Sequence, residues 1–181
     1  MGKQSWQVDA AHSAVSFSVR HMVISKVKGR FAKWTAKLDL DTSDLTAASV
    51  EVEIDVASID TGVPDRDAHL RSADFFDAAK YPTLTYRSRS VKQAGPEALH
   101  VVGDLTLHGV TKEVALEVEL GGQGKDPWGN LRTGFTAKTS VNRKEFGLAW
   151  NQALETGGVL VAEKVEIEIE LEAIQQAGKT A

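Results

Sequence analysis

The chain has 181 residues, of which 42% are hydrophobic and 25% charged, and its formal net charge is -4. This size and composition suit one folded domain over residues 1–181, with a core at about 6–174 and short frayed ends. The acidic balance gives no electrostatic basis for nucleic-acid binding, and the sequence contains no basic run of the kind that binds an anionic membrane. Cysteine is absent, which excludes disulfides, thiol catalysis and thiolate metal sites.

The N-terminal residues, MGKQSWQVDAAHS, contain no apolar segment of the kind found in secretory signals. A cytoplasmic location is therefore expected, or a periplasmic one if a signal has been removed. No run of 18 apolar residues occurs, so no membrane-spanning helix is expected.

Alternation of apolar and polar residues with a period of two dominates the sequence and predicts β-strands. Residues 49–56, SVEVEIDV, show it most clearly, with valine and isoleucine on one face and carboxylates on the other. One apolar face per strand is typical of antiparallel sheets. The predicted strands are, in chain order, residues 14–21, 33–40, 49–56, 84–86, 99–107, 114–120, 131–139 and 165–173.

The connections carry turn chemistry at His108-Gly109, at Gly121-Gly122 and over residues 126–130, and they predict hairpins. Strands joined in this way can close into a barrel or stack as a sandwich. The sequential order favours the barrel, because closure removes exposed sheet edges.

A single helical segment interrupts the strands at about residues 64–80. Pro64 suits the first helical position, and Asp67 lies in the first turn, where the helix dipole favours acids. Asp74 is expected to cap a second short turn, and Pro82 ends the segment. Its apolar side is predicted to cover one open end of the barrel.

A second irregular segment, residues 142–151, loses the alternation and is expected to fold over a rim. The residues predicted to close the ends of the barrel are Phe75, Phe76, Phe146 and Trp150.

Whether such a barrel is hollow depends on its inward side chains, since eight strands can enclose either a filled core or one small ligand. Small inward residues, namely Ala36, Gly103 and Ala137, would leave volume, but large and small residues could also interdigitate. Both interpretations stay open at this point. The candidates for a lining are Phe17, Trp34, Ile54, Tyr86, Leu105, Phe135 and Ile167.

Charged residues of the helical segment have two interpretations. Arg66, His69 and their neighbours could meet a ligand head group at the barrel mouth, or they could form a charge network in which carboxylates satisfy the arginines and hold the helix on the rim. Asn142 and Arg143 carry the same two interpretations. The histidines show no HxH or HExxH spacing, and no metal site is predicted from them.

Several motifs together resemble the YceI-like family over about residues 6–174. They are HSAVSFSVRHM (12–22), VKGRF (27–31), SIDTG (58–62), RDAHLRSADFFDAAKYP (66–82), GDLTLHGVTKEV (103–114), KDPWG (125–129) and NRKEFGL (142–148). The resemblance implies an eight-stranded antiparallel up-and-down lipocalin-like barrel whose lumen holds a long isoprenoid tail, as in quinones or polyprenyl phosphates. It brings no catalytic residue and no cofactor, and it suggests a homodimer.

The leading hypothesis is therefore a non-catalytic carrier of an isoprenoid lipid. A second hypothesis is an enzyme, or a metal-dependent activity on a bound lipid, which would require a polar cluster in the lumen such as His21 meeting His69. A third is a structural or stress-related domain with a filled core.

Overall fold

The computed structural model describes residues 2–154 and 160–180, with side chains described through residue 176. The strands are β1 (Gln4–Val8), β2 (Ala14–His21), β3 (Ser25–Phe31), β4 (Trp34–Leu40), β5 (Ser49–Asp55), β6 (Ile59–Asp60), β7 (Thr83–Gly95), β8 (Ala98–Leu107), β9 (Val110–Lys125), β10 (Leu131–Asn142) and β11 (Val161–Thr180). The helical elements are α1 (Pro64–Arg71) and the 3-10 turns η1 (Ala10–His12), η2 (Leu45–Ala47), η3 (Val56–Ser58) and η4 (Arg143–Phe146).

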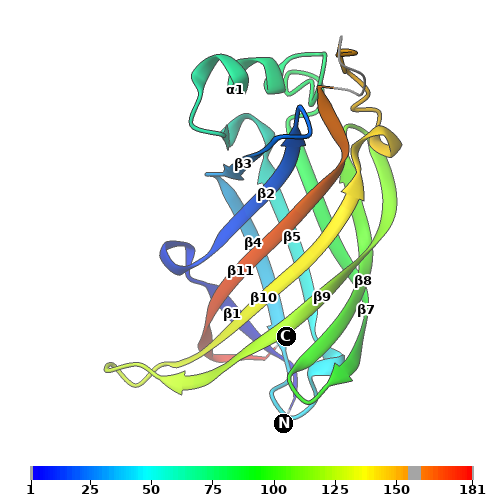
Figure 1. The fold of residues 1–181 in the computed structure, drawn as a ribbon. Helices are drawn as coiled ribbons and strands as arrows, with labels where there is room; N and C mark the ends of the chain where they lie inside the picture. Colours follow the sequence, from blue (N-terminus) through cyan, green and yellow to red (C-terminus); the bar gives the residue numbers. More distant parts are fainter. Residues whose placement is uncertain (1, 155–159, 181) are drawn as a thin grey trace.

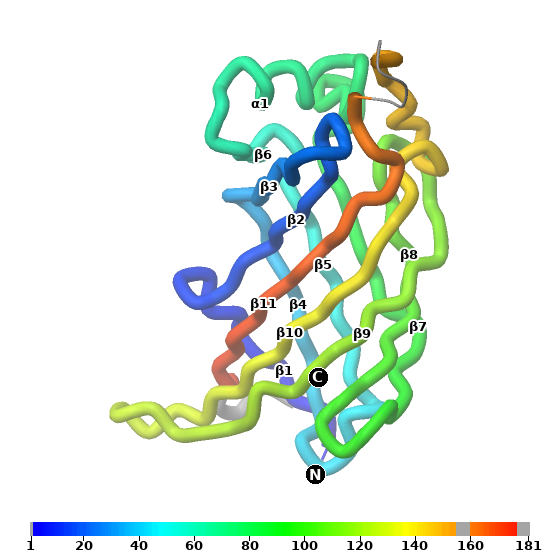
Figure 2. The backbone as a smooth tube through the Cα atoms, viewed as in Figure 1, coloured from blue at the N-terminus to red at the C-terminus, as the bar shows by residue number. Residues whose placement is uncertain are grey.

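Antiparallel pairing closes the sheet into a barrel (Figure 1). The closed ring runs β1–β4–β5–β7–β8–β9–β10–β11 and returns to β1, which makes eight strands. The other three strands lengthen this ring at the α1 end, where β2 follows β1, β3 precedes β4 and β6 follows β5 (Figure 2). The eight-stranded antiparallel up-and-down barrel with one short helix is therefore confirmed.

The strand positions agree with the alternation, with three additions. Residues 14–21 form β2 as predicted, and the strands that the alternation does not predict are β1, β3 and the two-residue β6. In β3, SKVKGRF, only two residues are large and apolar, so its alternation is weak. At the other terminus, where a frayed tail is predicted, β11 continues to Thr180 and pairs there with Gln4.

Two of the three predicted hairpin turns are confirmed. His108 and Gly109 join β8 to β9 with φ angles of 54° and 72°, and residues 126–130 join β9 to β10. The prediction for Gly121-Gly122 is wrong, because this pair lies inside β9 where the register against β10 shifts. Gly122 has a φ of 90°, and the same freedom that permits a turn here permits a β-bulge.

The helical segment is shorter than predicted. α1 ends at Arg71, and the chain continues to Pro82 in irregular turns. Asp74 does not cap a second helix; its carboxylate contacts the His69 imidazole at 2.8 Å. Asp67 in the first turn is buried and accepts hydrogen bonds from the backbone N–H and the hydroxyl of Thr61, at 2.9 and 2.5 Å.

One of the small inward residues leaves no empty space. A Cβ atom on Gly103 would lie 2.7 Å from the ring of Tyr86, so that ring already fills the site. The Tyr86 hydroxyl donates to the Val114 carbonyl at 3.0 Å, and burial raises the pKa of Tyr86 to about 12. Of the two interpretations left open above, the interdigitation of large and small residues therefore holds at Gly103.

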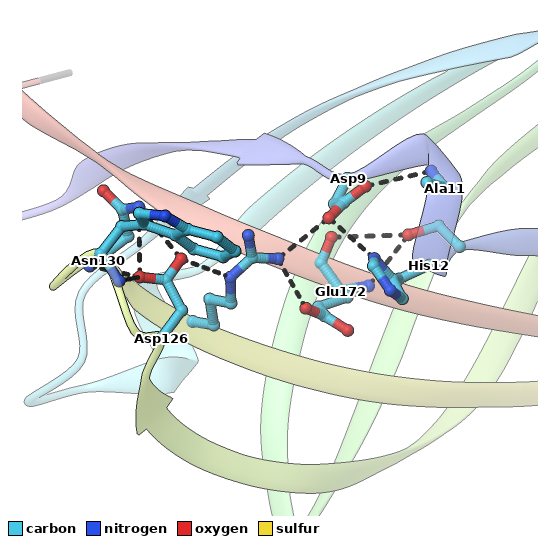
Figure 3. Close-up of polar contacts among 9 residues, drawn as sticks. Asp9, Ala11, His12, Asp126, Asn130 and Glu172 are labelled. Atoms are coloured by element: carbon cyan, nitrogen blue, oxygen red, sulfur yellow. Dashed lines mark hydrogen bonds and ion pairs between the residues drawn. The ribbon is translucent and has the colours of Figure 1, made fainter.

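Arg132 links three segments at the surface (Figure 3). Its guanidinium donates to Asp9 at 2.9 Å, to Glu172 at 2.8 Å and to Asp126 at 2.9 Å. Hydrogen bonds from His12 and Arg132 lower the pKa of Asp9 to about 2. Burial alone would raise the pKa of Asp126, but hydrogen bonds from Asn130 and Arg132 outweigh it and hold that pKa well below its usual range. The cluster fastens the β1–β2 corner to β11 and to the β9–β10 turn.

Replacing Arg132 by glutamine should lower stability in a pH-dependent way. The folded-state pKa of Asp9 lies below its ordinary value of 3.8, so this carboxylate stabilises the fold above that pH and loses its contribution as the pH falls through about 2. We expect R132Q to lower the urea midpoint at neutral pH, and the difference from wild type to shrink near pH 2, where Asp9 is half protonated. The control is Arg89→Gln, whose exposed ion pairs contribute little. A difference in urea midpoint between R132Q and wild type that stays the same from neutral pH to pH 2 would contradict the role assigned to the Asp9–Arg132 ion pair.

Candidate functional site

The barrel encloses a cavity of about 520 Å³. This volume falls within the range of about 300 to 1,000 Å³ that is usual for small-molecule sites. Aliphatic side chains such as Leu40, Leu99 and Leu171 line the end opposite α1. Charged side chains and histidines line only the α1 end, and they are Arg20, His21, Asp65, Arg66, His69 and Arg143. The interior is therefore hollow and apolar, with one polar mouth.

Most of the predicted lining residues border this cavity. The residues placed there are Phe17, Ile54, Tyr86, Leu105, Phe135 and Ile167. Trp34 is the exception: it is half-buried at the first position of β4 and packs against the core without lining the cavity. Alternation assigns a residue to a face of the sheet, but it does not give the depth along the barrel at which the cavity lies.

The cover over the mouth is an aromatic cluster drawn from two distant segments. His69 meets Trp150 edge-on with ring centroids 4.7 Å apart, and Phe75 lies 5.1 Å from His69 and 5.3 Å from Trp150. Phe76 makes an edge contact with Phe31 of the barrel wall at 6.0 Å. The helical interruption of the strands therefore covers the cavity together with residues 142–151.

Arg143 fixes the second half of this cover from inside. It is only 5% exposed and donates hydrogen bonds to the carbonyls of Leu148, Trp150, Val161 and Ala162, at 2.5 to 3.2 Å. Burial lowers the pKa of Arg143, and the charge of Glu163 acts in the opposite direction. Along the described part of the chain it makes no ion pair, so carbonyl dipoles satisfy its buried charge.

Two predicted mouth residues do not line the cavity. Asn142 caps η4 by accepting from the Lys144 N–H at 3.0 Å, and its amide contacts Glu163. Phe146 is 1% exposed and packs in the core beside η4. Both hold the cover in place from outside the cavity, because η4 presents Arg143 alone to the cavity interior.

α1 is fastened to the rim, but not by the predicted network of carboxylates. Arg66 donates to the hydroxyl and carbonyl of Thr61 at 2.7 and 2.8 Å. Arg71 donates to the carbonyls of Ala57 and Ile59 at 2.9 and 3.2 Å. Backbone carbonyls of residues 57–61, which precede the helix, therefore take the place of carboxylates.

The predicted histidine pair does not form a recognisable metal site. His21 and His69 both border the cavity, but neither belongs to a set of three clustered ligand groups in the portion of the chain described here. The set that does cluster is Asp9, His12 and Glu172, and none of these lines the cavity. The two carboxylates of this set, on Asp9 and Glu172, already accept hydrogen bonds from Arg132.

Arg20 and Asp65 border the cavity mouth although the sequence did not single them out. Alternation assigns Arg20 to the outer face of β2, and Asp65 lies in the first turn of α1, where the helix dipole alone would account for an acid. The two residues are 45 positions apart in the chain, and only the tertiary structure places both at the mouth.

A closed eight-stranded barrel with one apolar cavity beneath a cover belongs to the lipocalin-like class of β-barrels. Residues 6–173 match the YceI-like domain, and the chain belongs to the YceI-like family. It is 40% identical over 168 residues to the protein YceI of Escherichia coli O157:H7, covering 93% of this chain and 84% of that protein.

Solved structures share this fold. BcnA of Burkholderia cenocepacia superposes with a TM-score of 0.81 at 28% identity, covering 92% of this chain and 99% of that one. A domain of Saccharophagus degradans, described as polyisoprenoid binding and implicated in plant cell wall breakdown, superposes with a TM-score of 0.66 at 17% identity, covering 96% and 99%. In the part of the chain that the structure describes, no helix is long and apolar enough to cross a membrane.

Replacing Arg143 by methionine should loosen the cover. The change removes a buried cation and takes a donor from four carbonyls, of which Val161 keeps the Asn151 amide. We expect this to cost about 3 kcal/mol of unfolding free energy. Hydrogen exchange at the backbone of residues 147–154 should rise more than in the strands. The matched control is Arg30→Met, which removes an exposed ion pair with Asp60 at 3.4 Å and should cost less than about 1 kcal/mol. Equal losses of unfolding free energy in R143M and R30M would contradict the role assigned to Arg143.

Proposed function

We propose that the protein is a non-catalytic binding protein that holds a long isoprenoid lipid, of the polyprenyl or prenylquinone type, in the barrel cavity. The observation that carries the proposal is the distribution of its lining. Aliphatic and aromatic side chains surround most of the 520 Å³ cavity, and charged groups are confined to the mouth. Such a site suits a molecule with a long apolar tail and one polar end.

Burial of the tail supplies the affinity in this proposal. Each buried CH₂ group contributes about 0.8 kcal/mol, so a long hydrocarbon gains much without directed contacts. The head group would lie at the α1 end, near Arg66 and His69, whose side chains border the cavity. The polyisoprenoid-binding description of the Saccharophagus domain, which shares the fold, supports the same class of ligand.

The alternatives fit the structure less well. A filled core does not fit the observed cavity. An enzyme would need a converging set of reactive groups, but the His69 imidazole is engaged by Asp74 and Arg143 by backbone carbonyls. The polar groups of the mouth therefore support the cover more than they support a reaction. Homodimerisation and a cytoplasmic location stay predictions.

Organic extraction of the protein purified from cells should yield a prenyl lipid in roughly equimolar amount, identified by mass spectrometry. An extract free of lipid from cells that make prenyl lipids, together with failure to bind an added prenylquinone, would overturn the proposal. A stoichiometric lipid without isoprene units would replace the ligand class and keep the binding role.

Filling the cavity tests where this lipid sits. Ala137 lines the cavity, so phenylalanine at this position should occupy ligand space and reduce the extracted lipid to a small fraction of the wild-type amount. Its stability should change by less than about 3 kcal/mol, the usual limit for overpacking, because empty volume is present. The matched control is Ala115→Phe, on the outer side of β9, which should retain the lipid. Equal lipid content in both variants would place the ligand elsewhere.

A further inference from the structure

The β2–β3 hairpin carries an exposed apolar tip. Met22, Val23 and Ile24 are 41%, 70% and 83% exposed, although large apolar side chains are otherwise mostly buried. Three consecutive exposed apolar residues at one turn have no packing role in the barrel. An exposed apolar patch of this kind is typical of a surface that meets a partner or a membrane.

The backbone of this tip is also unusual. Met22 and Val23 have φ angles of 54° and 63°, in the left-handed region that glycine and asparagine prefer. A β-branched residue there is a conformational outlier, and Asn-Gly would adopt these two positive φ angles in the three-residue connection at less cost. The chain therefore keeps apolar side chains at a position where they cost conformational energy, which is the pattern expected of a functional tip.

The stem below the tip is cationic on its outer face. Arg20 and Lys26 are directly paired across the hairpin, and Lys28 and Arg30 follow on the same face opposite serines. All four are exposed. Lys26 contacts Glu166 at 3.5 Å and Arg30 contacts Asp60, but in the described structure Arg20 and Lys28 have no ion-pair partner. Glu166 of the neighbouring β11 therefore meets one cation of the directly opposed Arg20–Lys26 pair, and Arg20 and Lys28 are left for an external anion.

This hairpin lies at the mouth of the cavity. Figure 1 shows the β2–β3 turn at the same end of the barrel as α1. Arg20 and His21 border the cavity, and the Met22 N–H donates at 2.8 Å to the carbonyl of Leu160, which borders it too. A partner or membrane that contacts the tip of the hairpin therefore also faces the mouth of the cavity.

We infer that the β2–β3 hairpin docks the protein on an anionic lipid bilayer, with Met22, Val23 and Ile24 in the interface and the cations of the stem against acidic head groups. Apolar insertion combined with basic flanks is the physical signature of interfacial membrane binding. The inference rests on the proposed function for its purpose, since docking in this orientation would present the cavity mouth to membrane lipids. The sequence shows no basic run because these cations alternate along two strands and only the hairpin gathers them on one face.

The test measures co-sedimentation of the full-length protein with two kinds of vesicle: phosphatidylcholine alone, and phosphatidylcholine mixed with phosphatidylglycerol. We expect binding to the mixed vesicles that weakens as salt rises. Val23→Asp together with Ile24→Asp should reduce the partition coefficient by about tenfold or more, because it removes the inserted side chains. Arg20→Gln together with Lys28→Gln should reduce it roughly fivefold for each cation removed.

Two further variants separate docking from folding. Met22→Asn together with Val23→Gly supplies the preferred turn residues, so it should keep or raise stability while it weakens binding. Trp128→Asp changes an 80% exposed apolar residue in the β9–β10 turn, at the other end of the barrel, and should leave binding unchanged. Undiminished binding of the hairpin variants, or absence of wild-type binding to the mixed vesicles, would overturn the inference. Lipid extracted from the wild-type protein in the absence of vesicles reports separately on the proposed function. Lipid without vesicle binding would overturn this inference alone, and vesicle binding without lipid would overturn the carrier proposal alone.

Discussion

Strand β11 keeps the barrel closed, because it pairs with β10 along one edge and with both β1 and β2 along the other. Every other feature depends on this closure. A closed sheet of eight strands has a circumference set by strand number and tilt, so its interior cannot contract around small side chains. Ala137 therefore borders open space, whereas in a sandwich the facing sheets could approach and fill it.

Closure of the walls leaves the ends open, and the structure covers one of them with segments distant in sequence. Phe75, from the segment after α1, and Trp150, from the loop after η4, meet above the cavity. The polar side chains that hold these segments, above all Arg71 and Arg143, bond backbone carbonyls. Irregular backbone has many unpaired carbonyl groups, and a guanidinium with its several N–H donors can satisfy them without a second charge. Arginine side chains thereby attach the cover to the rim through backbone carbonyls of both.

The two ends of the cavity differ chemically for this reason. The backbone of the barrel wall is paired within the sheet, so its inner face needs only apolar side chains. The irregular backbone of the cover needs polar side chains as hydrogen-bond partners, and the charged residues are therefore found at the mouth. A ligand with an apolar tail and a polar head would find the two environments in the right order. The same mouth also carries the exposed tip of the β2–β3 hairpin, so the opening, its cover and the proposed docking surface form one region of the molecule.

The sequence by itself determined eight of the eleven strands, their one-sided burial and the identity of most lining residues, because alternation is a local property that each of these strands expresses independently. Phe17, Phe135 and Ile167 could be assigned to the interior in this way. It could not determine that Trp34 lies outside the cavity, that the Tyr86 ring fills the space at Gly103, or that Arg143 bonds four carbonyls. These facts depend on the stagger of the strands and on which loops meet over the rim. Only the tertiary structure decided them, because closure of the barrel brings together residues whose separation along the chain carries no record of the contact.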